Sequence, residues 1–180
     1  MNNKLLSLML LIIAAVAFTS CNDDEPAPQY TYFKPCIDWN ATPADVRAYM
    51  AASPGWAETT STDNTVFFKN ERTQTAIIYA FNKGTLAASI VTVSGFNDHY
   101  NDLKNQIAKD YGLTFKETSM LDFGIKPELM LNVLMHRFTT YMTAAYIDLD
   151  FLNLLELDPN NPESIKALID KIKAGLMPTA

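Results

Sequence analysis

Apolar residues follow three different patterns along the chain, and each pattern predicts a different kind of element. Residues 5–18 form an apolar run that only Ser7 interrupts. As a helix, this run would span about 21 Å, which is shorter than the roughly 30 Å hydrocarbon core of a bilayer. Residues 96–111 place apolar side chains at spacings of four, three, four and four, which forms one face of a helix. Residues 56–94 contain short runs rich in Thr, Val, Ile and Phe between turn residues, which predicts strands.

A first helix has well-defined ends. Thr42 suits the N-cap, Pro43 suits the first helical position, and the Asp45 side chain can reach back to the cap. The dipeptide at 54–55, Pro-Gly, ends this helix.

Two further helices are predicted. One is capped by Asn97 or Asp98 and runs to Tyr111, with Gly112 as its C-cap. The other runs over 162–175, after a Pro- and Asn-rich break, with apolar residues on one face.

Strands are predicted over 56–62, 65–69, 73–81 and 85–94, with a further strand over 113–119. The strands over 73–81 and 85–94 flank Asn82-Lys83-Gly84, which favours a hairpin with a three-residue loop and Gly84 in the left-handed position. Both faces of the segment at 76–81 are apolar, so we expect this strand to lie inside the sheet.

The pattern from Met120 to Leu157 is ambiguous. A helix could begin at Pro127 and continue to Arg137, while residues 139–149 are rich in Thr, Tyr and Ile and favour a strand. The resulting fold class is α+β, with an antiparallel sheet of about four to six strands and helices packed on one face.

The N-terminus carries a recognisable export signal. Lys4 precedes the apolar run, and the small residues Thr19 and Ser20 stand directly before Cys21. This arrangement resembles the lipobox of bacterial lipoproteins, although Phe18 stands where that pattern prefers Leu. The resemblance implies that residues 1–20 are removed and that Cys21 is acylated.

A hydrophilic segment follows the lipobox. Residues 22–35 contain three acidic residues and three prolines, so we interpret residues 21–35 as a lipidated flexible tether and residues 36–180 as one α+β domain. Asp23, Asp24 and Glu25 resemble the acidic export tether of surface lipoproteins in the Bacteroidota. This resemblance implies an outer-membrane lipoprotein at the cell surface. The alternative location is the periplasmic leaflet of the same membrane.

The order of elements resembles that of small outer-membrane lipoprotein domains. A helix opened by Thr-Pro-x-Asp-Val, with Trp39 before it and strands after it, is similar to SmpA/OmlA-like and β-lactamase-inhibitor-protein-like layouts. The resemblance covers about residues 40–94. It implies an envelope-assembly or inhibitor factor as one alternative function, and it assigns no functional residue.

The charge of the chain narrows the range of partners. The formal net charge is −6 at pH 7, and no basic stripe is present, which argues against a nucleic-acid partner. This acidity favours neutral or cationic partners. If Cys21 is lipidated, Cys36 has no intramolecular partner, and we interpret Cys36 as a buried structural thiol.

No catalytic, metal or cofactor motif emerges from the spacing of polar residues. His99 and His136 lack neighbouring ligands, so we expect no metal and no cofactor. Asp148 and Asp150 would share one face of a strand, which is the best arrangement for a hydrolase of envelope or environmental polymers. The same spacing is typical of an amphipathic strand.

Aromatic residues give the best candidate for a binding surface. Tyr30, Tyr32, Trp39 and Trp56 fit the core periodicity least well, and an exposed aromatic patch marks binding surfaces. We therefore expect a non-enzymatic module, anchored to the membrane by its lipid, that binds a glycan or a protein. The hydrolase and the envelope-assembly or inhibitor factor are the alternatives, and the sequence leaves the oligomeric state open.

Overall fold

The structure, a computed structural model of the whole chain, describes residues 30–117, 121–137 and 140–154. The chain divides into two units, one of which is Phe18–Leu149. In chain order, the described elements are α2 (Pro43–Ala51), β1 (Ala57–Thr62), β2 (Thr65–Asn70), β3 (Thr75–Asn82), β4 (Thr85–Ser94), η1 (Asn97–His99), α3 (Tyr100–Tyr111), β5 (Lys116–Glu117), β6 (Asp122–Lys126), η2 (Pro127–Leu129), β7 (Leu131–Arg137), β8 (Tyr141–Asp148) and α4 (Leu149–Leu154). Cys21, the predicted signal and the predicted helix over 162–175 lie outside the described residues.

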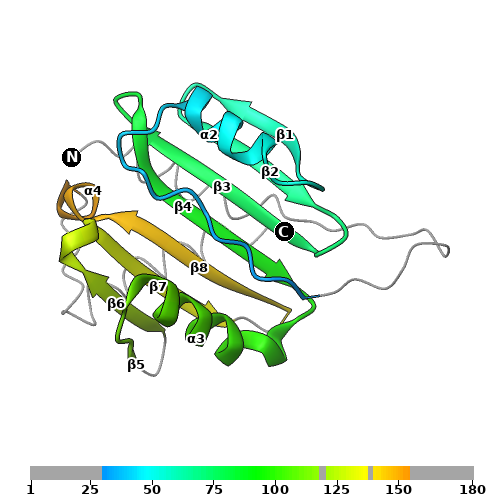
Figure 1. Cartoon of the computed structure of the whole chain (residues 1–180), viewed down its shortest axis with the longest axis vertical. Helices are drawn as coiled ribbons and strands as arrows, with labels where there is room; N and C mark the ends of the chain where they lie inside the picture. The colour runs from blue at the N-terminus through cyan, green and yellow to red at the C-terminus, as the bar shows by residue number, and fades with distance from the viewer. Residues whose placement is uncertain (1–29, 118–120, 138–139, 155–180) are drawn as a thin grey trace, which may run out of the picture. The chain divides into compact units, whose positions relative to one another are not determined.

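The strands form one eight-stranded antiparallel sheet in the order β1-β2-β3-β4-β8-β7-β6-β5 (Figure 1). The first four strands follow one another along the chain, and β8 then returns to pair with β4 in the middle of the sheet. The α+β class with an antiparallel sheet is confirmed. The prediction of four to six strands is wrong, because β6 and β7 were not expected.

The unexpected strands β6 and β7 lie in a region whose apolar residues fit a strand as well as a helix. The helix expected from Pro127 to Arg137 is wrong: only a 3-10 turn forms at its start, and Met130 then turns the chain with a φ of +49°. In β7, Leu131, Val133 and Met135 alternate on one face and are fully buried. A short apolar run suits a buried strand as well as a buried helix, so pairing with β6 and β8 decides the outcome.

Helix α2 forms as its sequence predicts. The Asp45 backbone N–H donates to the Thr42 hydroxyl at 3.3 Å, and the Asp45 carboxylate accepts from the Thr42 backbone N–H at 2.9 Å. This capping box satisfies two backbone donors that the first turn would otherwise leave unpaired. Val46 and Met50 are buried on the inner side of the helix.

Helix α3 begins later than predicted. Residues 97–99 form a 3-10 turn, and His99 occupies the N-cap without a side-chain hydrogen bond to the helix, so the predicted cap at Asn97 or Asp98 is wrong. The predicted apolar face is confirmed, because Leu103, Ile107 and Tyr111 are buried.

The β3–β4 hairpin forms where predicted, but its loop has two residues and not three, because Asn82 belongs to β3. Asn82 pairs with Thr85, and the two residues between them, Lys83 and Gly84, both have positive φ values of +53° and +90°. Such a two-residue turn matches the right-handed twist of the strands, and glycine adopts its second position without steric cost. Strand β3 lies inside the sheet and is buried on both faces, as predicted.

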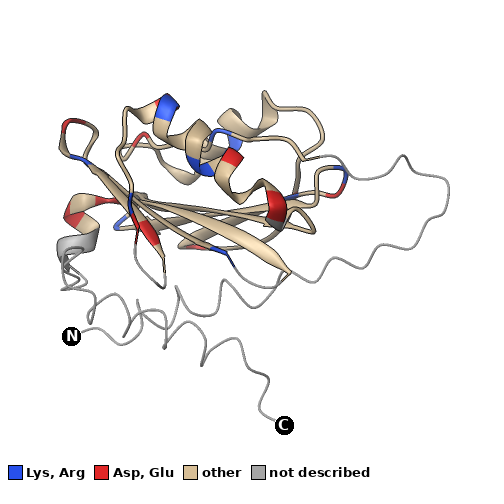
Figure 2. Ribbon diagram, turned by 90° about the horizontal axis from the view of Figure 1, so that it is seen from below, with Lys and Arg blue, Asp and Glu red and all other residues tan. Residues whose placement is uncertain are grey.

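The prediction of helices packed on one face is wrong as stated, because α2 and α3 do not form a continuous helical layer over the sheet. An extended segment, residues 30–37, crosses the sheet between these two helices (Figure 1). Within residues 30–149, this segment and both helices lie on the same side of the sheet (Figure 2).

Hydrogen bonds fix the crossing segment on the sheet. Ser89 stands between Tyr79 and Tyr146 in neighbouring strands, where its small side chain leaves room for the segment. The Ser89 hydroxyl donates to the Cys36 carbonyl at 2.6 Å, and the Cys36 backbone N–H donates to the Tyr79 hydroxyl at 3.4 Å. The Tyr79 hydroxyl donates in turn to the Met50 sulfur at 3.2 Å, which links the segment to α2.

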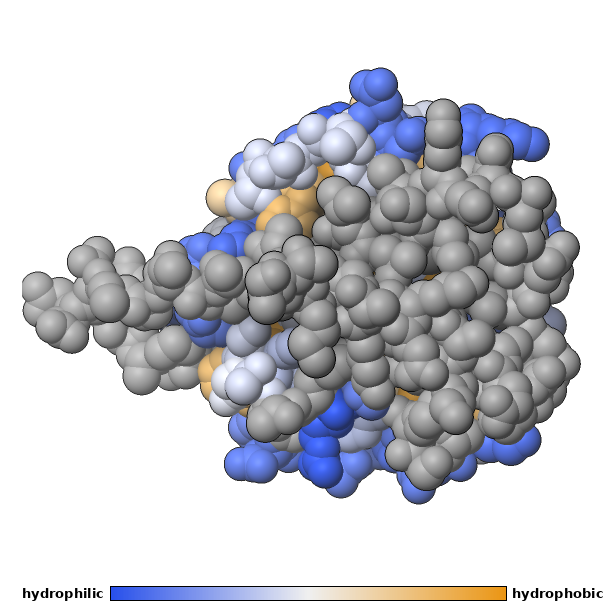
Figure 3. All heavy atoms as spheres, turned by 180° about the vertical axis from the view of Figure 1, so that it is seen from behind, coloured by the Kyte–Doolittle hydropathy of each residue, from blue (hydrophilic) through white to orange (hydrophobic). Residues whose placement is uncertain are grey.

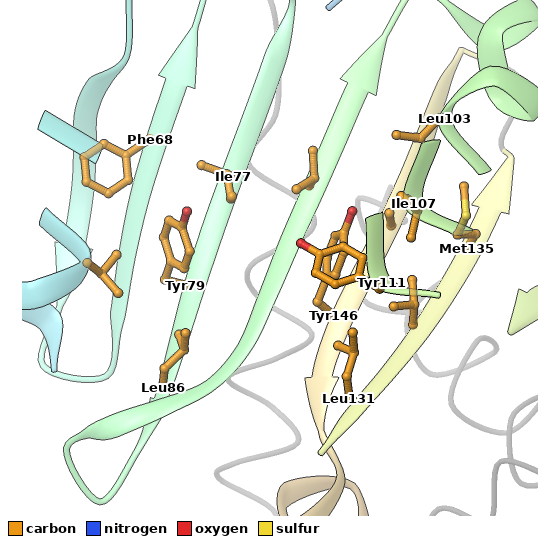
Figure 4. Close-up of a cluster of buried hydrophobic side chains, with 14 of the residues drawn as sticks. Phe68, Ile77, Tyr79, Leu86, Leu103, Ile107, Tyr111, Leu131, Met135 and Tyr146 are labelled. Atoms are coloured by element: carbon orange, nitrogen blue, oxygen red, sulfur yellow. The ribbon is translucent and has the colours of Figure 1, made fainter. Parts of the chain in front are cut away.

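One hydrophobic cluster joins α2, α3 and the sheet, and Tyr79, Tyr111 and Tyr146 stand at its centre (Figure 4). Tyr111 and Tyr146 meet edge to face, with ring centroids 5.7 Å apart. Figure 3 shows the molecule from behind. Among the described residues that are visible in this view, those at the rim are largely hydrophilic, and apolar residues lie between them.

Candidate functional site

A pocket of about 430 Å³ lies where the extended segment meets the sheet near the end of α2. Three stretches of the chain line it: 31–33 from the segment, 53–56 between α2 and β1, and 70–73 in the turn between β2 and β3. Its lining residues are Thr31, Tyr32, Phe33, Ser53, Pro54, Gly55, Trp56, Asn70, Arg72 and Thr73. We call this feature the aromatic pocket.

Aromatic packing holds the apolar wall in place. The rings of Phe33 and Trp56 are 4.6 Å apart and tilted by 52°, and both side chains are half-buried. Phe33 also meets Tyr49 edge to face at 6.4 Å, while the Tyr49 hydroxyl donates to the Lys34 carbonyl at 2.7 Å. Because neighbours hold these rings, the wall is preformed, which lowers the entropic cost of binding a ligand against it.

Gly55 gives the pocket its shape on the side of α2. Its φ is +84°, and a Cβ added there would lie 3.0 Å from the amide nitrogen of Asn70. Only glycine adopts this φ readily and also leaves room for the Asn70 side chain.

Asn70 presents its amide N–H group toward Gly55 and the pocket. The Asn70 amide oxygen accepts from the Thr73 backbone N–H at 3.2 Å, which assigns the orientation of the amide. The residue is 7 % exposed, and no described residue accepts a hydrogen bond from its amide nitrogen.

The two tryptophans differ in their remaining bonding capacity. The Trp39 indole N–H donates to the Leu129 carbonyl at 2.9 Å. Among the described residues, the Trp56 indole N–H has no acceptor. Trp56 therefore combines a half-buried apolar ring with a free donor, which is typical of aromatic side chains at binding sites.

The structure brings together only part of the predicted aromatic patch. Tyr32 and Trp56 both line the pocket, but Tyr30 stacks on His99 with ring centroids 4.7 Å apart, and Trp39 lies outside the lining. The four residues therefore do not form one surface.

Tyr32 links the pocket to the buried core. Its hydroxyl and those of Tyr111 and Tyr146 are buried without a hydrogen-bond partner. Burial raises the pKa of Tyr32 far above its usual value, and the nearby Asp110 carboxylate raises the pKa further. Burial, and secondarily Asp102, raises the pKa of Tyr30 to about 12. Both phenols are therefore neutral at physiological pH.

Asn70 and Arg72 fall between the predicted strands over 65–69 and 73–81, and nothing in the sequence pattern marks them as functional. They line the pocket because the β2–β3 turn folds back against Gly55 and the extended segment. An Asn and an Arg in a turn are common on protein surfaces, so the sequence carried no signal that distinguished them.

The other chemical candidates are not among the described residues that line this pocket. Strand β8 ends at Asp148, and Asp150 lies in α4, so the premise that both carboxylates share a strand face is wrong. Burial raises the pKa of the half-buried Cys36 thiol, which keeps it protonated at neutral pH. His99 bonds through Nδ1 to Asp102 at 2.9 Å. Among the described residues, no cluster of His, Cys, Asp and Glu is placed to hold a metal ion.

No helix within the described part of the chain combines the length and apolar character needed to cross a membrane. No protein-family model, curated protein or solved structure matches this chain.

Proposed function

We propose that this protein is a lipid-anchored module that binds a glycan in the aromatic pocket without transforming it. The observation that carries this proposal is Trp56, whose half-buried ring lines the pocket together with the polar side chains of Asn70 and Thr73 and whose N–H has no acceptor among the described residues. A sugar ring offers an apolar C–H face for stacking and hydroxyl groups at its edge for hydrogen bonds. The pocket volume of about 430 Å³ falls within the range of small-ligand sites, ~300–1,000 Å³.

The pocket lining favours binding over catalysis. The described residues that line it include no Asp, Glu, His or Cys. A hydrolase needs groups that donate and accept protons in the reaction, and carboxyl and imidazole groups are the usual choices. This lining supports the binding proposal against the hydrolase with Asp148 and Asp150.

The membrane anchor belongs to the same proposal. The export signal and Cys21 support acylation, and the first lining residue, Thr31, is ten residues beyond Cys21. Ten fully extended residues span at most about 35 Å. The glycan would therefore be captured close to the membrane surface, and the acidic residues 23–25 support the outer face of the outer membrane.

Calorimetric titration of the full chain in detergent tests the proposal. The probes are hexasaccharides of β-1,4-glucan, β-1,3-glucan, β-1,4-xylan and α-1,4-galacturonan. We expect at least one to bind, and Trp56→Ala to weaken its binding about tenfold or more through the lost stacking surface.

Trp39→Ala is the matched control, because it removes the other tryptophan outside the pocket. Circular dichroism verifies that each variant is folded. Absence of binding to every saccharide, or equal weakening by Trp39→Ala and Trp56→Ala, would overturn the proposed function.

A further inference from the structure

The pocket has an excess of hydrogen-bond donors. The Asn70 amide nitrogen and the Trp56 indole N–H have no acceptor among the described residues, and the same holds for the Arg72 guanidinium. The Asn70 amide oxygen is occupied by the Thr73 backbone N–H. Apart from the second lone pair of the Asn70 amide oxygen, the unpaired groups of these three side chains are therefore donors.

Charged acceptors are missing from the same surface. Among the described lining residues there is no Asp or Glu and the Tyr32 hydroxyl is buried, so the accessible side-chain acceptors are neutral: the hydroxyls of Thr31, Ser53 and Thr73. A ligand group that only accepts hydrogen bonds pairs with the three donors and needs no acceptor from the protein in return. The charge on Arg72 strengthens such a hydrogen bond when the ligand group is an oxyanion.

Arg72 is the single charged residue among the lining residues, and it is exposed. The other described arginines are engaged elsewhere. Arg47 binds the Glu58 carboxylate at 2.9 Å, and the Arg137 guanidinium lies 5.8 Å from the Tyr100 ring centroid. The neighbouring Glu71 pairs with Lys69 at 3.4 Å. Arg72 is thus available to a ligand, and its planar fork matches carboxylate and sulfate groups.

We propose that the aromatic pocket selects saccharides that carry an anionic substituent, either a carboxylate or a sulfate ester. Arg72 and the Asn70 amide bind the oxyanion, while the Trp56 ring packs against the sugar. This inference rests on the proposed function and adds the class of ligand.

The net charge of −6 opposes anionic ligands only at long range. At physiological ionic strength, charges more than about 8 Å apart are largely screened. A direct contact with Arg72 therefore outweighs the distant acidic residues.

Three tetrasaccharides serve as probes in calorimetric titrations of the full chain in detergent. They are tetragalacturonate, its fully methyl-esterified form, and a sulfated galactan fragment. We expect at least one anionic probe to bind tenfold or more tightly than the neutral ester. Comparison of tetragalacturonate with the sulfated fragment shows whether the pocket prefers a carboxylate or a sulfate ester.

Arg72→Gln should remove the preference for the anionic probe. Arg47→Gln is the matched control, since it neutralises an exposed arginine outside the pocket, and it should preserve the preference. Trp56→Ala should weaken the binding of every probe that binds to the wild-type protein.

Two results would overturn this inference. One is equal affinity of the wild-type protein for the ester and both anionic probes. The other is an anionic preference that persists in Arg72→Gln. Either result leaves the proposed function intact if Trp56→Ala still weakens binding. Failure of all saccharides to bind would overturn both.

Discussion

At position 55 the backbone turns with a φ of +84°, and the space where a Cβ would stand is taken by the Asn70 amide. The absence of a side chain at position 55 thus allows both the path of the chain after α2 and the orientation of the Asn70 amide. Position 84 has a similar φ of +90°, but a Cβ there would meet no atom within 4 Å. A substitution at Gly84 therefore tests backbone strain alone, whereas a substitution at Gly55 tests backbone strain together with the contact to Asn70.

Gly55→Ala should destabilise the protein by about 1 kcal/mol through backbone strain and also displace the Asn70 amide, which weakens saccharide binding. Gly84→Ala should show a similar loss of stability with unchanged binding, because only the strain is present there. Urea denaturation and calorimetric titration measure the two effects. Equal binding by both variants would contradict the role assigned to Asn70.

At the scale of elements, the aromatic pocket depends on the extended segment 30–37, which supplies one of its walls. The Ser89 and Tyr79 hydroxyls fix this segment, and Tyr49 binds its Lys34 carbonyl. A ligand that contacts both the segment and the sheet binds the docked arrangement and stabilises it. Docking of the segment and occupation of the pocket are therefore coupled.

The capping box of α2 makes stability depend on pH. Hydrogen bonds from the Thr42 side chain and then its backbone lower the pKa of Asp45 in the folded protein. The stabilisation is therefore present above the unfolded pKa, ~3.9, and is lost as the pH falls through the lower folded pKa.

Thr42→Ala should lower the free energy of unfolding by about 1 kcal/mol at pH 7 and reduce the pH dependence below pH 4. Urea denaturation between pH 2 and pH 7 measures both effects. Thr42→Ser keeps the hydroxyl and should restore most of the stability. A Thr42→Ala protein as stable as the wild type would show that the cap contributes nothing.

At the scale of the whole molecule, the proposed lipid anchor would determine where the pocket operates. Cys21→Ala should abolish acylation and leave an uncleaved precursor, because the cysteine is both the lipid acceptor and the residue after the cleavage site in the lipoprotein pattern. Metabolic labelling with an alkyne fatty acid detects the change. Cys36→Ala is the control and should retain the label, whereas label retained in Cys21→Ala would contradict the assignment.

The acidic residues after the anchor make the location testable. Replacing Asp23, Asp24 and Glu25 by Asn, Asn and Gln keeps the length and hydrophilicity of the segment but removes its charge. If the charge directs export, protease added to intact cells should digest the wild type and spare the neutral variant. Equal digestion would show that charge is not the signal, and equal protection would place both proteins on the periplasmic leaflet.

The sequence by itself determined the elements whose signals are local. The capping box of α2, the hairpin around Lys83-Gly84 and the apolar stripe of α3 were all predicted, because each depends on residues close together in the chain. The antiparallel α+β class followed from the same signals.

The tertiary structure decided what depends on distant contacts. Strand β7 has its conformation because β6 and β8 flank it, and its apolar run alone also allowed a helix. Trp56 and Asn70 meet only after the sheet forms, whereas Trp39 is bound to Leu129 far along the chain. The aromatic pocket could not be predicted from sequence, because its walls come from three stretches that only folding brings together.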